Sequence, residues 1–232
     1  MRMEWKTFWN DSPQVRDPDP CRQVGRTFRN VGFSEGQLAI LVERLLCFLD
    51  ASPDKTLLDL ACGNGLVTTR LAPRFRHVTA VDFSAPLIEV ARSRFSATNV
   101  EYLLGDAVVL DGVHGPFDCA LISAAVQHLT IAQLRSIFQQ LKTRVRPGGC
   151  IVLGDVPDAE RKWNFYRGVQ GRSRYGVDLL RRKAIIGSWW RSTTLLELAL
   201  ECGWTLAIHY QTPDLPNYYF RFDAVLRTPD AR

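Results

Sequence analysis

The sequence predicts a doubly wound α/β sheet, and three observations support this prediction. Between residues 56 and 155, short apolar runs alternate with stretches of helical periodicity, as in parallel strands joined by crossover helices. A turn containing Gly63 and Gly65 links the first apolar run to a helical stretch, and an acid, Asp82, closes the second run. In a doubly wound sheet these features meet at the carboxyl ends of the strands, which is where such sheets bind ligands.

Length and composition favour one globular domain. The chain has 232 residues, 46% of them hydrophobic and 23% charged, so it can bury a full core. No run approaches the roughly 20 apolar residues of a membrane span, and Met1–Asn10 lacks the apolar core of a signal peptide, so we expect a cytoplasmic protein. The six cysteines are far apart and show no zinc-like spacing, so we expect reduced thiols and no metal site.

The chain begins with a segment that we expect to form an arm or lid. Residues 1–33 combine aromatic side chains with Asp17–Pro20, whose prolines cannot continue a helix. From Ser34, a candidate helix cap, leucine and valine recur at helical spacing until Pro53 ends the pattern. This stretch is the first predicted helix.

Strands and helices then alternate along most of the chain. The predicted strands are Thr56 to Leu60, His77 to Val81, Val100 to Leu104, Phe117 to Ile122, Gly149 to Gly154, Trp204 to Gln211 and Tyr218 to Leu226. The predicted helices are Leu66 to Pro73, Ala85 to Phe95, Ile131 to Val145 and Ser192 to Cys202. Residues 156–191 interrupt the alternation and are predicted to be an insertion, after which residues 192–232 supply the last helix and strands.

The turn after the first strand has the chemistry of a nucleotide-binding loop. Gly63 and Gly65 permit positive φ and a close approach of the backbone to a ligand, and a helix starting near Leu66 directs free N–H groups toward it. Asp82 follows Gly65 by 17 residues, where a carboxylate can accept hydrogen bonds from both ribose hydroxyls. A dinucleotide-binding dehydrogenase would share these features, but Thr68 stands where its third glycine belongs.

Five short motifs occur between residue 57 and about residue 155. They are Asp59–Gly65, Val81–Ser84, Gly105–Ala107, Phe117–Leu129 and Arg146–Gly149. In this order they resemble motifs of the class I methyltransferases that use S-adenosylmethionine (SAM): the first motif, the ribose-binding acid, the adenine-side acid, the fourth strand with its loop, and the turn before the fifth strand. The resemblance implies SAM as cofactor, residues 34–155 as the SAM-binding core, and a Rossmann-like, doubly wound seven-stranded sheet. That sheet would be mostly parallel, with an antiparallel last strand and helices on both faces.

The same resemblance implies which residues bind the cofactor. Gly63 and Gly65 would pass under the methionine part of SAM. Asp82 would bind the ribose, and Phe83 and Asp106 would flank the adenine. The full predicted set is Asp59, Ala61, Cys62, Gly63, Gly65, Asp82, Phe83, Leu87, Asp106, Ala107, Ser123 and Arg26.

Three further side chains are candidates for roles next to the transferred methyl group. His128 lies in the loop that borders this group in related enzymes and is a candidate general base, with simple packing against the loop as the alternative. Asp155 is a second candidate for catalysis, or for capping the turn that follows it. Arg26 is a candidate partner of the SAM carboxylate, with a solvated surface arginine as the alternative.

The segment 158–191 is strongly basic and aromatic. Its nine Lys and Arg residues face three Asp and Glu residues, a local excess larger than the +5 of the whole chain. Arginines interleaved with rings suit a small acceptor with phosphate, carboxylate or sugar groups. We therefore expect residues 156–191 to bind the acceptor through Trp163, Tyr166, Arg167 and Trp190. The expected reaction is O- or N-methylation of a small acidic or sugar-containing molecule.

Other interpretations of the sequence stay open. Arginines and rings also bind single-stranded RNA, but the small net charge and the lack of an Asn-Pro-Pro-Tyr-like tetrad favour a small molecule over a nucleic acid. The basic segment can also be a solvated helix. A SAM-binding subunit without catalysis is a further alternative, although the glycines and acids of the loop are intact. Both a monomer and a homodimer fit the sequence.

Overall fold

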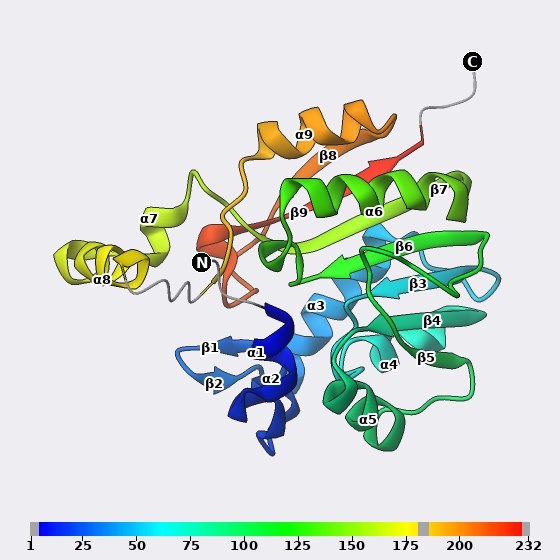
Figure 1. Cartoon of the computed structure of the whole chain (residues 1–232), viewed down its shortest axis with the longest axis horizontal. Coiled ribbons are helices and arrows are strands. Elements are labelled where there is room, and N and C mark those ends of the chain that lie inside the picture. Colours follow the sequence, from blue (N-terminus) through cyan, green and yellow to red (C-terminus); the bar gives the residue numbers. More distant parts are fainter. Residues whose placement is uncertain (1–4, 181–185, 229–232) are drawn as a thin grey trace.

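A seven-stranded sheet forms the centre of the protein, which a computed structural model describes over residues 5–180 and 186–228 (Figure 1). Its strands are β3 (Thr56–Leu60), β4 (His77–Asp82), β5 (Val100–Leu104), β6 (Phe117–Ser123), β7 (Val145–Pro157), β8 (Thr205–Tyr210) and β9 (Arg221–Arg227). They lie in the order β5-β4-β3-β6-β7-β9-β8, and β9 runs in the direction opposite to all the others. The predicted fold class is confirmed.

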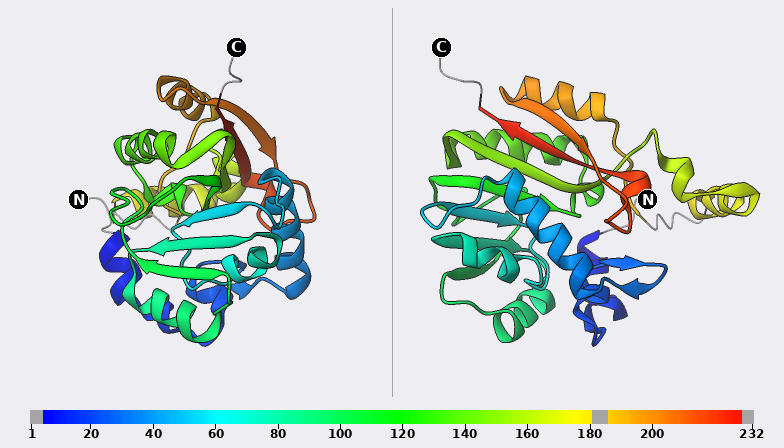
Figure 2. Two further views of the ribbon diagram at one scale, coloured as in Figure 1. Left: turned by 90° about the vertical axis from the view of Figure 1, so that its right-hand side faces the viewer. Right: turned by 180° about the vertical axis from the view of Figure 1, so that it is seen from behind.

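Helices cover both faces of this sheet (Figure 2). On one face lie α3 (Glu35–Phe48), α4 (Thr68–Leu71) and α5 (Ala85–Arg94), and on the other lie α6 (Ile131–Arg144) and α9 (Ser192–Glu201). Because successive strand residues point to opposite faces, Leu57 packs under α3 while Leu58 packs under α6. Ser34 and Thr130 begin α3 and α6 with complete capping boxes.

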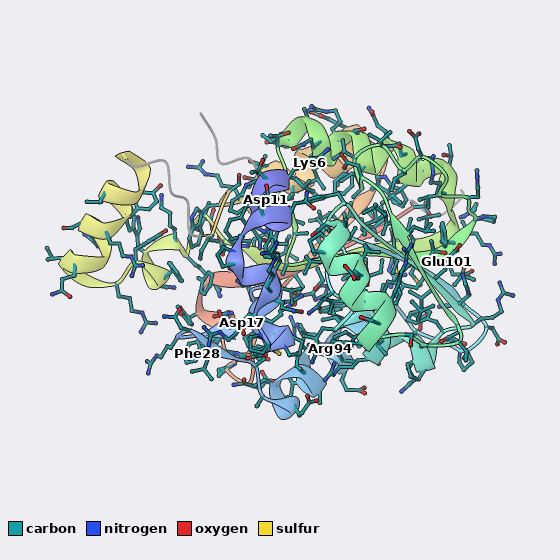
Figure 3. The ribbon with its side chains drawn as sticks, turned by 60° about the horizontal axis from the view of Figure 1, so that its bottom comes forward. Lys6, Asp11, Asp17, Phe28, Arg94 and Glu101 are labelled. Carbon is teal, nitrogen blue, oxygen red and sulfur yellow. The ribbon has the colours of Figure 1, made fainter. Side chains whose placement is uncertain are left out.

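The N-terminal segment lies beside the carboxyl ends of the parallel strands. It comprises α1 (Trp5–Asp11), a 3-10 turn (Pro13–Arg16), α2 (Pro20–Gln23) and a short hairpin of β1 (Thr27–Phe28) and β2 (Val31–Gly32). Figure 3 shows α1, with Lys6 and Asp11 labelled, next to α5, which ends at Arg94. Helix α1 is thereby held beside the carboxyl ends of the parallel strands.

The insertion after β7 forms two helices at the same end of the sheet. These are α7 (Lys162–Phe165) and α8 (Gly168–Leu180), which project from the body of the molecule (Figure 1). Three of the basic residues that define the segment, Arg181, Arg182 and Lys183, lie outside the described residues.

Three predicted boundaries are wrong. Tyr218–Phe220 is a 3-10 turn rather than the start of the last strand. Its backbone N–H groups bond to nearby carbonyls such as that of Leu215, and pairing with β7 begins only at Arg221. The predicted helix Leu66 to Pro73 is only α4 followed by a 3-10 turn at Ala72–Arg74. Conversely, β7 begins at Val145, opposite Phe117, and not at Gly149.

None of the described helices is both long and apolar enough to span a membrane.

Candidate functional site

A cavity of about 710 Å³ opens at the carboxyl ends of β3, β4 and β6. Its volume lies in the range of about 300–1,000 Å³ that is usual for small-molecule sites. The loop after β3 lines one end, and the loop after β6 and residues 186–189 line the other. Helix α1 contacts both ends, through Lys6 with Asp106 and through Trp5 with His128. The cavity therefore lies where the strand order reverses between β3 and β6, the usual ligand position in such sheets.

The loop after β3 depends on residues with positive φ. Ala61 and Gly63 both have φ 58°, and Gly65 has φ 78°. A Cβ on Gly63 would lie 2.9 Å from Cγ1 of Val24, whereas a Cβ on Gly65 would lie 2.5 Å from the hydroxyl oxygen of Tyr102. Gly63 lines the cavity and Gly65 does not, so the positive φ and the close packing of Tyr102, rather than a ligand, require a glycine at position 65.

Asp82, at the end of β4, fixes this loop. Its Oδ2 accepts a hydrogen bond of 2.8 Å from the backbone N–H of Gly63, and its Oδ1 accepts one of 2.8 Å from that of Ser84. A carboxylate has about four lone-pair positions, so each oxygen retains one for a ligand in the cavity. Burial raises the pKa of Asp82 to about 6, although the backbone hydrogen bonds oppose the rise.

Two more carboxylates line the cavity. Asp59, at the floor, accepts a hydrogen bond of 2.7 Å from the hydroxyl of Thr68, and burial raises its pKa to about 7. Asp106, after β5, forms a 2.6 Å ion pair with Lys6 of α1 and accepts a hydrogen bond from the backbone N–H of Val108. The contact between Lys6 and Asp106 ties α1 to the rim of the cavity.

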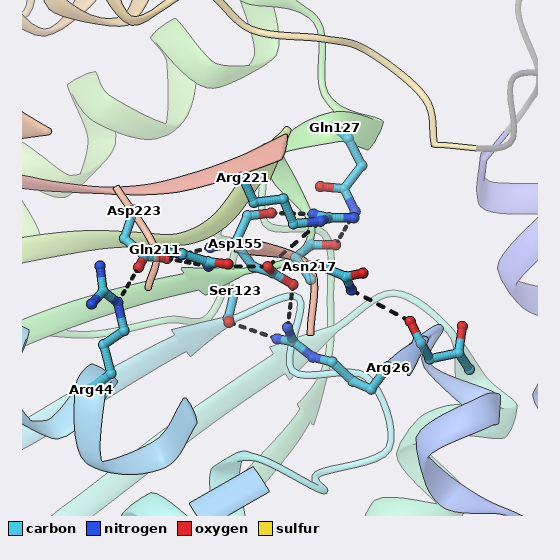
Figure 4. Close-up of polar contacts among 11 residues, drawn as sticks. Arg26, Arg44, Ser123, Gln127, Asp155, Gln211, Asn217, Arg221 and Asp223 are labelled. Carbon is cyan, nitrogen blue, oxygen red and sulfur yellow. Dashed lines mark hydrogen bonds and ion pairs between the residues drawn. The ribbon is translucent and has the colours of Figure 1, made fainter. Parts of the chain in front are cut away.

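Arg26 reaches into the sheet instead of facing solvent (Figure 4). Its Nη1 lies 2.6 Å from Oδ2 of Asp155, and its Nη2 donates to the hydroxyl of Ser123 at 2.7 Å. Asp155 also contacts Arg221 and accepts a hydrogen bond of 3.2 Å from Gln211. Arg26 and Ser123 line the cavity, whereas Asp155 lies behind them.

The loop after β6 places His128 against the N-terminal helix. The ring centroid of His128 is 4.0 Å from that of Trp5 and 5.7 Å from that of Trp9. Burial lowers the pKa of His128 to about 3, so the imidazole is neutral at physiological pH. The indole N–H of Trp190 donates to the carbonyl of Val126 at 3.1 Å, which ties this loop to the insertion.

The predicted acceptor-binding residues separate into two groups. Tyr166 lines the cavity, together with Tyr175 and Trp189, which the sequence analysis did not select. Trp163 and Arg167 do not line it, and neither does the buried Trp190. Nothing in the local sequence indicates that Trp189 lines the cavity and Trp190 does not. For Trp5 and Trp9, the spacing of one helical turn could have predicted that both rings lie on the same face of α1.

Comparison with known proteins identifies the family. Residues 57–149 match the family described as a methyltransferase domain. An uncharacterized methyltransferase of Mycobacterium tuberculosis is 35% identical over 96 residues, which cover 41% of this chain and 48% of that protein. The malonyl-[acyl-carrier protein] O-methyltransferase of Salmonella typhimurium is 32% identical over 126 residues, or 52% of this chain and 49% of that one. Residues 57–149 belong to the class I SAM-dependent methyltransferase family. The chain spans about half the length of these relatives.

Solved structures agree on the fold of this methyltransferase. The magnesium protoporphyrin IX methyltransferase of Synechocystis, determined with bound S-adenosylhomocysteine (SAH), has a TM-score of 0.66 at 14% identity. The similarity covers 97% of this chain and 98% of that one. At this identity the likeness concerns the fold alone.

The residues around the cavity fit SAM, the cofactor of the family. Gly63 presents bare backbone, Asp82 has free lone pairs for two hydroxyls, and Phe83 and Leu87 supply an apolar wall. Of the twelve residues that the sequence assigned to the cofactor, all but Gly65 line the cavity. In the part of the chain that the structure describes, no cluster of three or more His, Cys, Asp and Glu side chains is arranged to hold a metal ion.

Proposed function

We propose that this methyltransferase transfers the methyl group of SAM to a small-molecule acceptor. One observation carries the proposal: a single cavity extends from Gly63 and Asp82, which fit the cofactor, past Ser123 to the rings of Tyr166 and Trp189. Cofactor and acceptor can therefore lie next to each other in one cavity, with the loop after β6 beside both of them. Such an arrangement aligns two reactants and excludes water.

The chemistry asks little of the protein beyond alignment. SAM supplies a methyl group on a positively charged sulfur, which is already activated. An oxygen or nitrogen lone pair of the acceptor forms the new bond to the methyl carbon while the carbon–sulfur electron pair returns to sulfur, and the acceptor then loses its proton. The loop carrying Ser123 and His128 borders this region, and Asp82 and Arg26 hold the site around it.

The proposal is tested by incubating the protein with methyl-labelled SAM and a fractionated metabolite extract. We expect the label in a low-molecular-mass product, which mass spectrometry then identifies. Label in RNA would favour the RNA methyltransferase instead. Binding of SAM without release of SAH in any fraction would favour a non-catalytic subunit.

SAM affinity is expected to fall as the pH decreases from 8 to 5. Ribose hydroxyls donate to the charged form of Asp82, whose pKa in the free protein is raised to about 6. Below that value each pH unit weakens binding by up to about tenfold, because a proton must first be released. Calorimetric titrations at several pH values measure this dependence.

The Asp59→Asn variant serves as the control for this titration. Asp59 also titrates in the cavity, with a pKa of about 7, but it is hydrogen-bonded to Thr68. We expect Asp59→Asn to retain the pH dependence near 6 and Asp82→Asn to lose it. A flat profile for the unchanged protein would show that Asp82 does not bind the ribose in its charged form.

Replacing His128 by asparagine is expected to lower turnover about tenfold without changing SAM affinity more than about twofold. We propose that the neutral imidazole accepts a hydrogen bond from the acceptor, since a group with a pKa of about 3 is a weak base. The pH profiles of turnover should then have the same shape between pH 5 and 8 in the unchanged protein and in His128→Asn. No inflection in this range should depend on His128. Such an inflection would establish His128 as the general base.

A further inference from the structure

Aromatic rings line the acceptor end of the cavity. Trp5 comes from α1, Tyr166 and Tyr175 from the insertion, and Trp189 from the chain after it. The rings of Tyr166 and Tyr175 lie 4.8 Å apart, and those of Tyr166 and Trp189 lie 6.0 Å apart. These distances are typical of rings in contact, so the chamber presents several faces on which a flat molecule can stack.

The charged side chains that line the cavity lie at its other end or are already paired. Lys6 is bound to Asp106 at 2.6 Å, and Arg26 is bound to Asp155 at 2.6 Å. Asp59 and Asp82 belong to the region that fits SAM. Among the described residues, therefore, the acceptor chamber has no charged side chain free to neutralise an acidic group.

Three of the described basic residues of the insertion do not face the cavity. Lys162 lies over the ring of Tyr175 at 4.5 Å, Arg161 over Tyr210 at 3.8 Å, and Arg167 over Tyr219 at 5.1 Å. None of these three cations lines the cavity. Each stacks on a ring instead, and the ring under Lys162 is one of those that line the chamber.

One polar atom beside the chamber has no partner. Nδ1 of His128 is buried and forms no hydrogen bond with any described residue. His128 lines the cavity between the aromatic end and the cofactor end. A buried polar atom without a partner is costly, and rotation of the ring toward the cavity would let a hydroxyl or amine of a bound molecule satisfy it.

From these observations we infer that the acceptor is an uncharged, ring-bearing molecule whose methylated hydroxyl or amine lies beside His128. This inference rests on the proposed function and names its substrate class. It departs from the acidic acceptor expected from the sequence, because an anion in this chamber would lose its hydration without gaining a partner among the described side chains. Stacking between rings stabilises a neutral flat molecule there instead.

The experiment compares two probes that differ by one carboxylate, 2-naphthol and 6-hydroxy-2-naphthoate. Calorimetry measures their binding to the protein saturated with SAH. We expect 2-naphthol to bind at least about tenfold more tightly, since the carboxylate must be desolvated without a counter-charge. Tighter binding of the naphthoate, or no binding of either probe, would overturn the inference.

Substitutions locate the binding to the chamber. Trp189→Ala and Tyr175→Ala should each weaken 2-naphthol about five- to tenfold, while Trp189→Phe should restore most of the affinity because it keeps a ring. Tyr210→Ala is the matched control, since Tyr210 is an exposed ring on β8 that does not line the cavity. Equal effects of Trp189→Ala and Tyr210→Ala would contradict the inference.

SAH binding separates the two proposals. If the unchanged protein does not bind SAH, the proposed function itself fails. If it binds SAH, and the alanine variants bind SAH within about twofold of it, any failure with 2-naphthol concerns only the acceptor class. The labelled product from the metabolite extract gives a second readout: it should partition into organic solvent at neutral pH and pass through an anion exchanger.

Discussion

Replacing Asp82 by alanine is expected to weaken SAM binding by at least about 100-fold. The change removes the acceptor of two ribose hydroxyls, and hydrogen bonds to a charged group contribute about 1.5–3 kcal/mol each. It also leaves the backbone N–H groups of Gly63 and Ser84 without their acceptor, so the loop under the cofactor loses its anchor. Isothermal titration calorimetry with SAM and with SAH measures the effect.

The asparagine variant sharpens this test. Both oxygens of Asp82 accept hydrogen bonds from backbone N–H groups. In Asp82→Asn, the side-chain NH₂ group must therefore face one of these N–H donors. We therefore expect Asp82→Asn to bind SAM nearly as poorly as Asp82→Ala. Asp111→Asn, at an exposed aspartate between β5 and β6 that does not line the cavity, is the control and should bind normally. Wild-type affinity in Asp82→Asn would disprove the role of Asp82.

Replacing Asp155 by alanine is expected to lower the free energy of unfolding by about 3–5 kcal/mol, because it leaves buried arginines without a counter-charge. Arg26 lies 2.6 Å from the carboxylate, and Nε of Arg221 lies 3.6 Å from it (Figure 4). Asp155 also has φ 64°, a conformation that disfavours alanine more than aspartate or asparagine. For a chain of this size the loss corresponds to a decrease in Tm of roughly 10 °C, which calorimetry would detect.

Asp155→Asn separates charge from backbone conformation. Asparagine tolerates the positive φ but does not neutralise the arginines, so we expect it to retain only part of the lost stability. Equal stability of Asp155→Ala and the unchanged protein would show that the cluster contributes nothing to folding.

The pH dependence of the same ion cluster has a definite sign. Burial alone would raise the pKa of Asp155, but Arg221 and Arg26 outweigh it and hold this pKa below its ordinary value. A carboxyl whose pKa is lower in the folded state stabilises the protein above its unfolded pKa and loses that effect as the pH falls below about 4. Asp155→Asn should therefore differ most from the unchanged protein at neutral pH and converge with it in acid.

Periodicity and turn chemistry determined most of the sheet and the cofactor end of the site. These parts follow from local patterns: the alternating burial of Leu57 and Leu58, the glycine turn, and the acid that closes β4. Because the carboxyl ends of parallel strands lie at one edge of the sheet, the glycine turn and the acid come together there without any long-range information. Exact ends were harder to predict. The aromatic run Tyr218–Phe220 favours a strand by propensity, but it forms a turn because the surrounding packing decides its conformation.

Which distant side chains complete the site was decided only by the tertiary structure. Arg26 and Asp155 are separated by 129 positions and still form a buried ion pair, because the N-terminal segment folds back over the sheet. Trp189 lines the cavity while its neighbour Trp190 anchors the loop after β6. Adjacent side chains in non-helical backbone point in different directions, and composition gives no clue to which of the two faces the ligand. The sequence therefore determined the sheet, the cofactor loop and the family, whereas long-range packing determined the walls of the acceptor chamber.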